Sequence, residues 1–335
     1  MDADQRVPRD SFAYQEVARL YGLARSLRPT AADRWNGALY ATNSDNLGGL
    51  HPETGDLRLS ERRVLRYLTG SRAQAHADDQ AEALATVLYQ ATHAAMHVMA
   101  PNEPNAVWTE HSRGLMVGFA EVRTFADFDA FADRAGYGAP PLGDPQYAGA
   151  FTATRDLMNH ITGPAYLKHA LINDACRGPA LMHFDKFAKA IVENRLSELV
   201  RRDETEQRAI RATLIGSMLH DHWPTLHSAP AATGHRVAHE IRSNLDAKID
   251  EIRRHYRLPG PRPAHDHSGT SRDREPTRPA PTARQDTLDG LRFLAQQAPP
   301  AGAVARNPKL GQGSRRPNTS LDRLIRPSHS SPARD

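Results

Sequence analysis

Apolar and polar positions repeat with a helical period along most of the chain. Residues 10–27 carry apolar side chains at helical spacing behind a candidate capping residue, Asp10, and this segment ends before Pro29. From residue 78 the same period returns, interrupted by loops that contain Pro and Gly. The pattern predicts seven further helices, over 78–99, 112–136, 145–162, 164–175, 182–200, 203–221 and 230–257.

The stretch after the first helix has a different pattern. Two short runs, 38–42 and 56–59, have the composition of strands, whereas residues 48–49 and 53–55 are typical of turns. Ser60 then precedes a helical run, SERRVLRYL, as a capping residue. We therefore predict a predominantly helical α+β fold, with a small N-terminal β region and a helical C-terminal half.

The character of the chain changes again after residue 258. Half of its 24 prolines fall in residues 259–335, which are rich in Arg and poor in apolar side chains. Such a segment buries too little apolar surface to offset the entropy of ordering. We predict a mostly helical domain over 1–258 and a disordered basic tail over 259–335. Within the tail, residues 287–297 (TLDGLRFLAQQ) have the spacing of a short helix.

Composition narrows the classes of protein to consider. The tail holds 13 Lys and Arg against 7 Asp and Glu, a net charge of +6, which leaves about −2 for the rest of a chain whose formal charge is +4. The chain has 335 residues and a single cysteine, Cys176, which fits a reducing compartment. No apolar run approaches the length of a membrane span, and the first residues lack the pattern of a secretion signal. We expect a cytoplasmic protein without membrane contact.

Candidate chemistry is concentrated in one predicted helix. The segment TVLYQATHAAMH, residues 86–97, places Tyr89 four residues before His93 and His97 four residues after it. Residues four apart share a helical face, so two His side chains at this spacing can bind one metal ion. Downstream, the segment RGLMVGFAEVRTF places Val117 and Glu121 four residues apart on the next helix.

These segments resemble the zincin-like zinc metallopeptidases of bacteria, of the gluzincin type, over roughly residues 37–163. The common family form of the first segment would read TVLHEATHA, and the second resembles L-x-E-G-x-x-E. A tyrosine-containing segment, DPQYAGAFTATRDLM, follows as in many small members. The resemblance implies a zincin-like fold, with zinc as the cofactor if any is bound.

The chain departs from the family pattern at the residues that carry the chemistry. Tyr89 stands at the first His ligand, Gln90 at the general base and Val117 at the ligand Glu. A neutral phenol is a poor zinc ligand, since its pKa is about 10, and an amide cannot take a proton from water. His93 remains from the first motif and Glu121 from the second. The YQATH motif therefore indicates a degenerate catalytic site.

Three functional readings follow. The first is a zincin-like protein that has lost catalysis and acts as a binding or scaffold protein, with its cleft holding a peptide or protein partner. The second is an active metal-dependent peptidase with a shifted site, built from His93, His97 and an acidic residue within 110–121, such as Glu121. The third is a nucleic-acid-associated protein that acts through its basic tail.

Overall fold

The computed structural model describes most of the N-terminal three quarters of the chain: residues 4–69, 76–96, 100, 102–138, 140–163, 165–200 and 203–257. Residues 259–335, with the predicted helix at 287–297, lie outside the described residues. His97 lies outside them as well. The predicted boundary at residue 258 and the predicted tail therefore stay predictions.

Four short strands form one sheet in the order β1-β2-β4-β3: β1 Gln5–Arg6, β2 Leu39–Thr42, β3 Gly48–Leu50 and β4 Leu57–Ser60. The two central strands, β2 and β4, are parallel, and each edge strand pairs with its neighbour in the antiparallel sense. The runs predicted as strands at 38–42 and 56–59 are confirmed as β2 and β4.

The edge strand β3 corrects one expectation, since residues 48–49 were assigned to a turn. Gly48 pairs with Leu59 and Leu50 pairs with Leu57 in an antiparallel ladder. A Cβ on Gly48 would lie 2.4 Å from the carbonyl oxygen of Arg58, so only glycine fits there. The glycines that resemble a turn in the sequence instead allow β3 to approach β4 closely.

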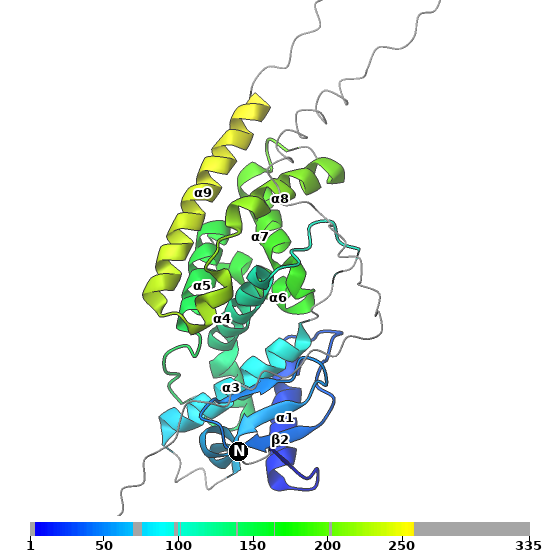
Figure 1. Ribbon diagram of the computed structural model, residues 1–335, viewed down its shortest axis with the longest axis vertical. Coiled ribbons are helices and arrows are strands. Elements are labelled where there is room, and N and C mark those ends of the chain that lie inside the picture. The colour runs from blue at the N-terminus through cyan, green and yellow to red at the C-terminus, as the bar shows by residue number, and fades with distance from the viewer. Residues whose placement is uncertain are drawn as a thin grey trace, which may run out of the picture. The chain divides into compact units, whose positions relative to one another are not determined.

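Helices make up most of the described chain (Figure 1). The α-helices are α1 Phe12–Leu27, α2 Arg66–Thr69, α3 Ala77–Ala95, α4 Glu110–Ala135, α5 Ala148–Thr162, α6 Ala165–Arg177, α7 His183–Ile191, α8 Glu204–Met218 and α9 Ala231–Arg257. Shorter 3-10 and π-helical turns are η1 Glu61–Leu65, η2 Ala180–Met182, η3 Val192–Leu196 and η4 Trp223–Ser228. The mainly α, α+β class is therefore confirmed.

The helix boundaries agree with the sequence prediction apart from local details. The N-cap of α1 is Ser11 rather than Asp10, because the Ser11 side chain accepts a hydrogen bond from the backbone N–H of Tyr14. Ser60 is confirmed as a cap, since its side chain accepts from the N–H of Arg63. The helix predicted over 182–200 is divided into α7 and η3.

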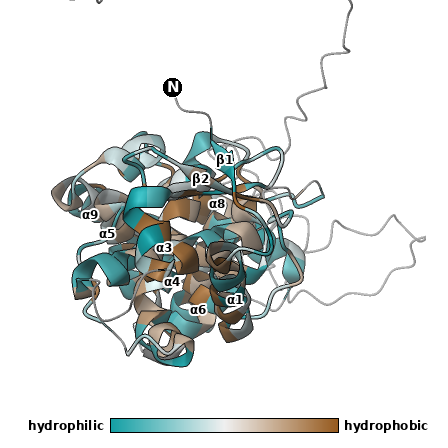
Figure 2. Ribbon diagram, turned by 90° about the horizontal axis from the view of Figure 1, so that it is seen from below, coloured by the Kyte–Doolittle hydropathy of each residue, from teal (hydrophilic) through white to brown (hydrophobic). Residues whose placement is uncertain are grey.

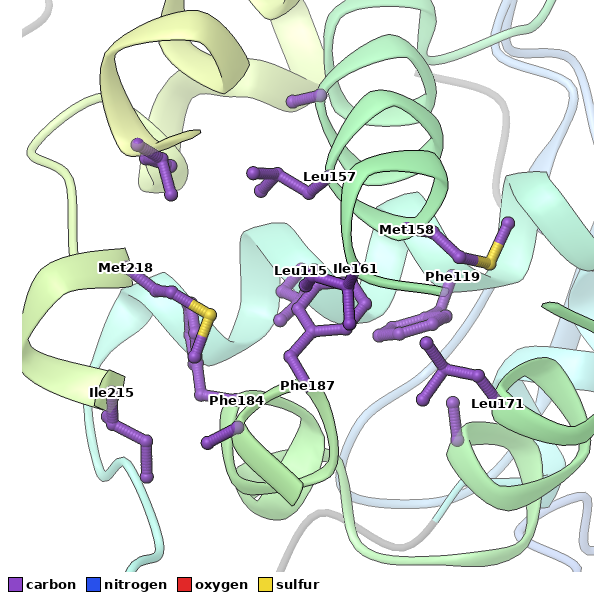
Figure 3. Packing of buried hydrophobic residues seen from close by; sticks show 14 of the residues in the cluster. Leu115, Phe119, Leu157, Met158, Ile161, Leu171, Phe184, Phe187, Ile215 and Met218 are labelled. Atoms are coloured by element: carbon purple, nitrogen blue, oxygen red, sulfur yellow. The ribbon is translucent and has the colours of Figure 1, made fainter. Parts of the chain in front are cut away.

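Two large hydrophobic clusters form most of the core, and a third, small cluster consists of Ala100, Leu181 and Met182. One large cluster lies between the sheet, α1, α3 and the end of α4; the other lies among α4 to α9. In the second, buried side chains from several helices point toward one another, among them Leu115, Phe119, Leu157 and Phe187 (Figure 3). Brown, hydrophobic ribbon gathers accordingly around α4 and α6 in Figure 2. Helices α3 and α4 contribute to both clusters, so they join the two halves of the fold.

The last described helix, α9, packs along α5 (Figure 1). Its inward face is the apolar stripe predicted from the sequence: Val237, Ile241, Leu245, Ile249 and Ile252, all fully buried. Within the described ranges, no helix is both long and apolar enough to cross a bilayer.

Candidate functional site

Helix α3 carries the YQATH segment through the centre of the fold. Asp78 and Asp79 lie in its first turn, where negative charge is favourable to the helix dipole. Behind the helix, the fully buried Arg123 of α4 donates to the hydroxyl of Thr92 at 3.0 Å and to the carbonyl of Ala24 at 2.7 Å. Asp127 pairs with both Arg123 and Arg28. This network fixes α3 against α1 and α4, and so fixes the position of the YQATH segment.

A cleft of about 740 Å³ opens between strand β3 and helices α3 and α4, and we call it the β3 cleft. Tyr89, Gln90 and His93 line it from α3, and Val117 lines it from α4. The structure thus brings together the three positions that depart from the family motif and the one His that remains.

The β3 cleft is bordered by a sheet edge with free backbone groups. The N–H of Ser60 bonds to the carbonyl of Leu47, and the N–H of His51 bonds to the carbonyl of Asp56. Bonded and non-bonded pairs alternate in an antiparallel ladder, so the N–H and C=O groups of Gly48 and Leu50 point away from β4. Gln90 donates from Nε2 to the carbonyl of Gly48 at 3.3 Å. The remaining outward groups of β3 are available to another strand.

Tyr89 remains a neutral phenol in this setting. It is 5% exposed and packs against Tyr147, with the ring centroids 5.4 Å apart. Burial raises the pKa of Tyr89 well above its usual range, and the nearby Tyr147 and Glu121 add to that effect. A phenolate, the form that binds metals, is therefore strongly disfavoured at this position.

His93 is a neutral imidazole. Burial lowers its pKa to about 4, and the charges of Arg34 and Arg113 act in the same direction. Its Nδ1 is buried and has no hydrogen-bond partner within the described chain. An unpaired buried nitrogen costs free energy.

Glu121 faces a different cavity. It lines a pocket of about 460 Å³ together with other carboxylates, and we call this the acidic pocket: Asp78, Asp79, Glu82, Glu121 and Asp144. Its Oε1 accepts the backbone N–H of Tyr147, the residue that precedes α5, at 3.2 Å. Burial raises the pKa of Glu121 to about 7, and the Tyr147 N–H acts in the opposite direction. Of the motif residues, only Tyr89 lines both cavities.

The residues present do not fit a zincin zinc site. A neutral phenol, an amide and an aliphatic side chain occupy the positions of the first ligand, the base and the last ligand. Glu121 and His93 line separate cavities, and His97 falls outside the described residues. Over the part of the chain that the structure describes, no three His, Cys, Asp or Glu side chains form a metal-binding group. The shifted site with His97 stays a prediction.

Two residues of the β3 cleft, Arg34 and Trp108, could not be predicted from the sequence. Arg34 lies in a loop without regular structure, and only the folded chain shows that its guanidinium reaches the end of β3, where it donates to the carbonyl of Pro52. Trp108 lies before α4 and is 49% exposed at the cleft. An exposed tryptophan beside a cleft is a feature of binding surfaces, and its place after the predicted loop APNEPN is the only sequence signal.

No protein-family model, curated protein or solved structure in the comparisons matches this chain. The zincin resemblance therefore rests on the residues of the chain and on their arrangement.

Proposed function

We propose that the protein is a zincin-like, non-catalytic binding protein whose β3 cleft holds an extended peptide segment of a partner. The observation that carries this proposal is the free edge of β3 alongside a cleft in which Tyr89, Gln90 and Val117 replace a metal-binding set. A peptide strand can pair with the outward N–H and C=O groups of such an edge. The volume of about 740 Å³ is within the range of ligand-binding cavities.

The side chains at the altered positions support binding rather than hydrolysis. Gln90 donates a hydrogen bond to the carbonyl of Gly48 and so contacts the edge of β3. In a peptidase this position would need a base. Val117 and Met116 give the α4 wall of the cleft an apolar surface, and Trp108 extends that surface outward. Backbone pairing would supply affinity, and these side chains would select among peptides.

The test removes one outward N–H of β3. Leu50→Pro deletes the Leu50 N–H, which the ladder does not use, and proline is tolerated at edge positions of this kind. Leu50→Ala is the matched control, because it shortens the same side chain and keeps the N–H. The full-length protein and both variants are exposed to a phage library of random nine-residue peptides. We expect the wild type and Leu50→Ala to enrich a common set of peptides, and Leu50→Pro to lose it.

Two results would count against the proposal. One is equal enrichment on Leu50→Pro and wild type, which would place any peptide contact away from β3. The other is one zinc ion per chain after purification without chelator, lost in His93→Ala and accompanied by peptide hydrolysis. That second result would favour the active metalloprotein with a shifted site.

A further inference from the structure

The β3 cleft contains an arginine that lacks an acidic partner. Arg34 Nη2 donates to the carbonyl of Pro52 at 3.0 Å, and no carboxylate of the described chain forms an ion pair with this guanidinium. Several other arginines of the same half of the fold pair with a carboxylate: Arg25, Arg28, Arg58, Arg62 and Arg63. Unlike these five arginines, Arg34 keeps N–H donors that no carboxylate of the described residues accepts.

The fold holds Arg34 in place at one end of β3. Its backbone N–H donates to the carbonyl of Ala94 near the end of α3. Its carbonyl packs against Gly55, where an added Cβ would lie 2.1 Å from the oxygen. The side chain is partly buried, and burial lowers its pKa. An arginine always remains charged, so a partly buried and unpaired guanidinium attracts an anion from the cleft side.

Three charged residues line the β3 cleft, Arg34, Arg113 and Glu110, so positive charge exceeds negative charge there. Arg113 lines it from α4, and its only ion-pair partner among described residues, Glu110, is 3.8 Å away with both side chains largely exposed. Such an exposed pair is weak and leaves Arg113 available. His93 is neutral and adds no negative charge. The carboxylates of the neighbouring acidic pocket are grouped in the other cavity.

We propose that the β3 cleft selects an extended peptide that carries an Asp or Glu side chain, which pairs with Arg34 where β3 ends. This inference rests on the proposed function and specifies its ligand. A planar guanidinium with several free N–H groups is suited to grip a carboxylate with two hydrogen bonds. The chain's own residues 259–335 carry a net charge of +6, so charge complementarity favours a separate acidic partner over this segment.

The proposal is tested with the same phage library, in which peptides are joined to the coat protein and so have no free carboxyl end. We expect peptides enriched by the full-length wild type to share an Asp or Glu at one position, and Arg34→Gln to lose that preference. Arg236→Gln is the matched control, since Arg236 is 61% exposed on α9 and does not line the cleft. It should enrich the same acidic peptides as the wild type.

A synthetic form of one enriched peptide, blocked at both ends, then gives affinities by fluorescence anisotropy. Replacing its acidic residue with the amide should weaken binding to the wild type by about tenfold or more. The same replacement should change binding to Arg34→Gln by less than about twofold, because the partner charge is already gone. Arg34→Lys should fall between the two, as it keeps the charge but not the planar fork. If Arg34→Gln fails to fold, the peptide replacement on the wild type still decides.

The outcomes separate this inference from the proposed function. If neutral peptides are enriched and bind Arg34→Gln as well as wild type, the β3 cleft binds peptides and the acidic preference is wrong. If the synthetic peptide binds only when its carboxyl terminus is left unblocked, Arg34 recognises a chain end and the side-chain assignment is overturned. If no peptide is enriched on the wild type, the proposed function fails and the inference fails with it.

Discussion

The buried charge network behind α3 gives a prediction whose size follows from the structure. Asp127 is 9% exposed, and its carboxylate contacts Arg28 Nε at 2.5 Å, Arg28 Nη2 at 2.6 Å and Arg123 Nε at 3.3 Å. Asp127→Asn keeps the shape of the side chain and removes the only negative charge in this group. Two buried guanidinium groups then face a neutral amide, of which one end repels their N–H donors.

Removing one partner from a buried pair costs about 3–5 kcal/mol, because the remaining charge stays buried without compensation. We expect Asp127→Asn to lower the free energy of unfolding by that amount. With a urea m-value of about 2–3 kcal/mol/M, the midpoint should fall by roughly 1–2.5 M. Circular dichroism during urea titration measures this shift.

Asp129→Asn is the matched control on the same helix. Asp129 is exposed, so the same change of chemistry should alter stability by less than about 0.5 kcal/mol. The double variant Arg28→Gln with Asp127→Asn should lose less than the sum of the two single losses, since each removes the same contacts. Equal midpoints for Asp127→Asn and Asp129→Asn would refute the view that this network fixes α3 against α1 and α4.

Three further predictions concern the motif residues. Gly118→Ala should lower the free energy of unfolding, measured by urea titration, by about 1–3 kcal/mol, because its Cβ would lie 1.9 Å from Thr154 Oγ1. The control Gly22→Ala, which has open space around it on α1, should leave the free energy of unfolding unchanged or raise it. Glu121→Gln should leave the free energy of unfolding unchanged at pH 4 and raise it at pH 8 by on the order of 1–3 kcal/mol. The pKa of Glu121 is about 7 in the folded protein and 4.5 in an ordinary Glu, so the wild type loses stability as the pH rises between these two values. The triple variant Tyr89→His, Gln90→Glu, Val117→Glu should gain zinc affinity over the parent by calorimetry, and a folded triple variant without that gain would show that positions 89, 93 and 117 do not meet at one point.

The helical part of the fold could be predicted because its signal is local. The apolar residues of α9 recur at helical spacing over its whole length, and each is buried as that pattern requires. Strand β3 could not be predicted in this way. Its Gly48-Gly49 pair has the composition of a turn, and it becomes a strand only because β4 offers a partner at close range.

The candidate site likewise has a part that the sequence predicts and a part that it does not. The resemblance assigns Tyr89, His93 and Val117 to one candidate site, and all three line the β3 cleft. It also grouped Glu121 with His93 as candidate ligands, yet the two line separate cavities, a distinction that depends on side-chain direction within the folded core. The lack of an acidic partner for Arg34 depends on all the residues around it in the folded protein, so no short stretch of sequence predicts it.

Gly118 and Glu121, both on α4, have structural tasks that do not involve a metal. Gly118 lets α4 approach α5, since any Cβ there would meet Thr154 and the carbonyl of Ala150. Glu121 accepts the N–H of Tyr147 and so holds the start of α5. By contrast, the residues that depart from the family all border the β3 cleft. Substitution at the cleft surface changes what the cleft binds without disturbing the helix packing, whereas substitution of Gly118 would force α4 and α5 apart. Under the proposed function, substitution of Gln90 or Val117 would alter what the cleft binds, and substitution of Gly118 would alter how α4 packs on α5.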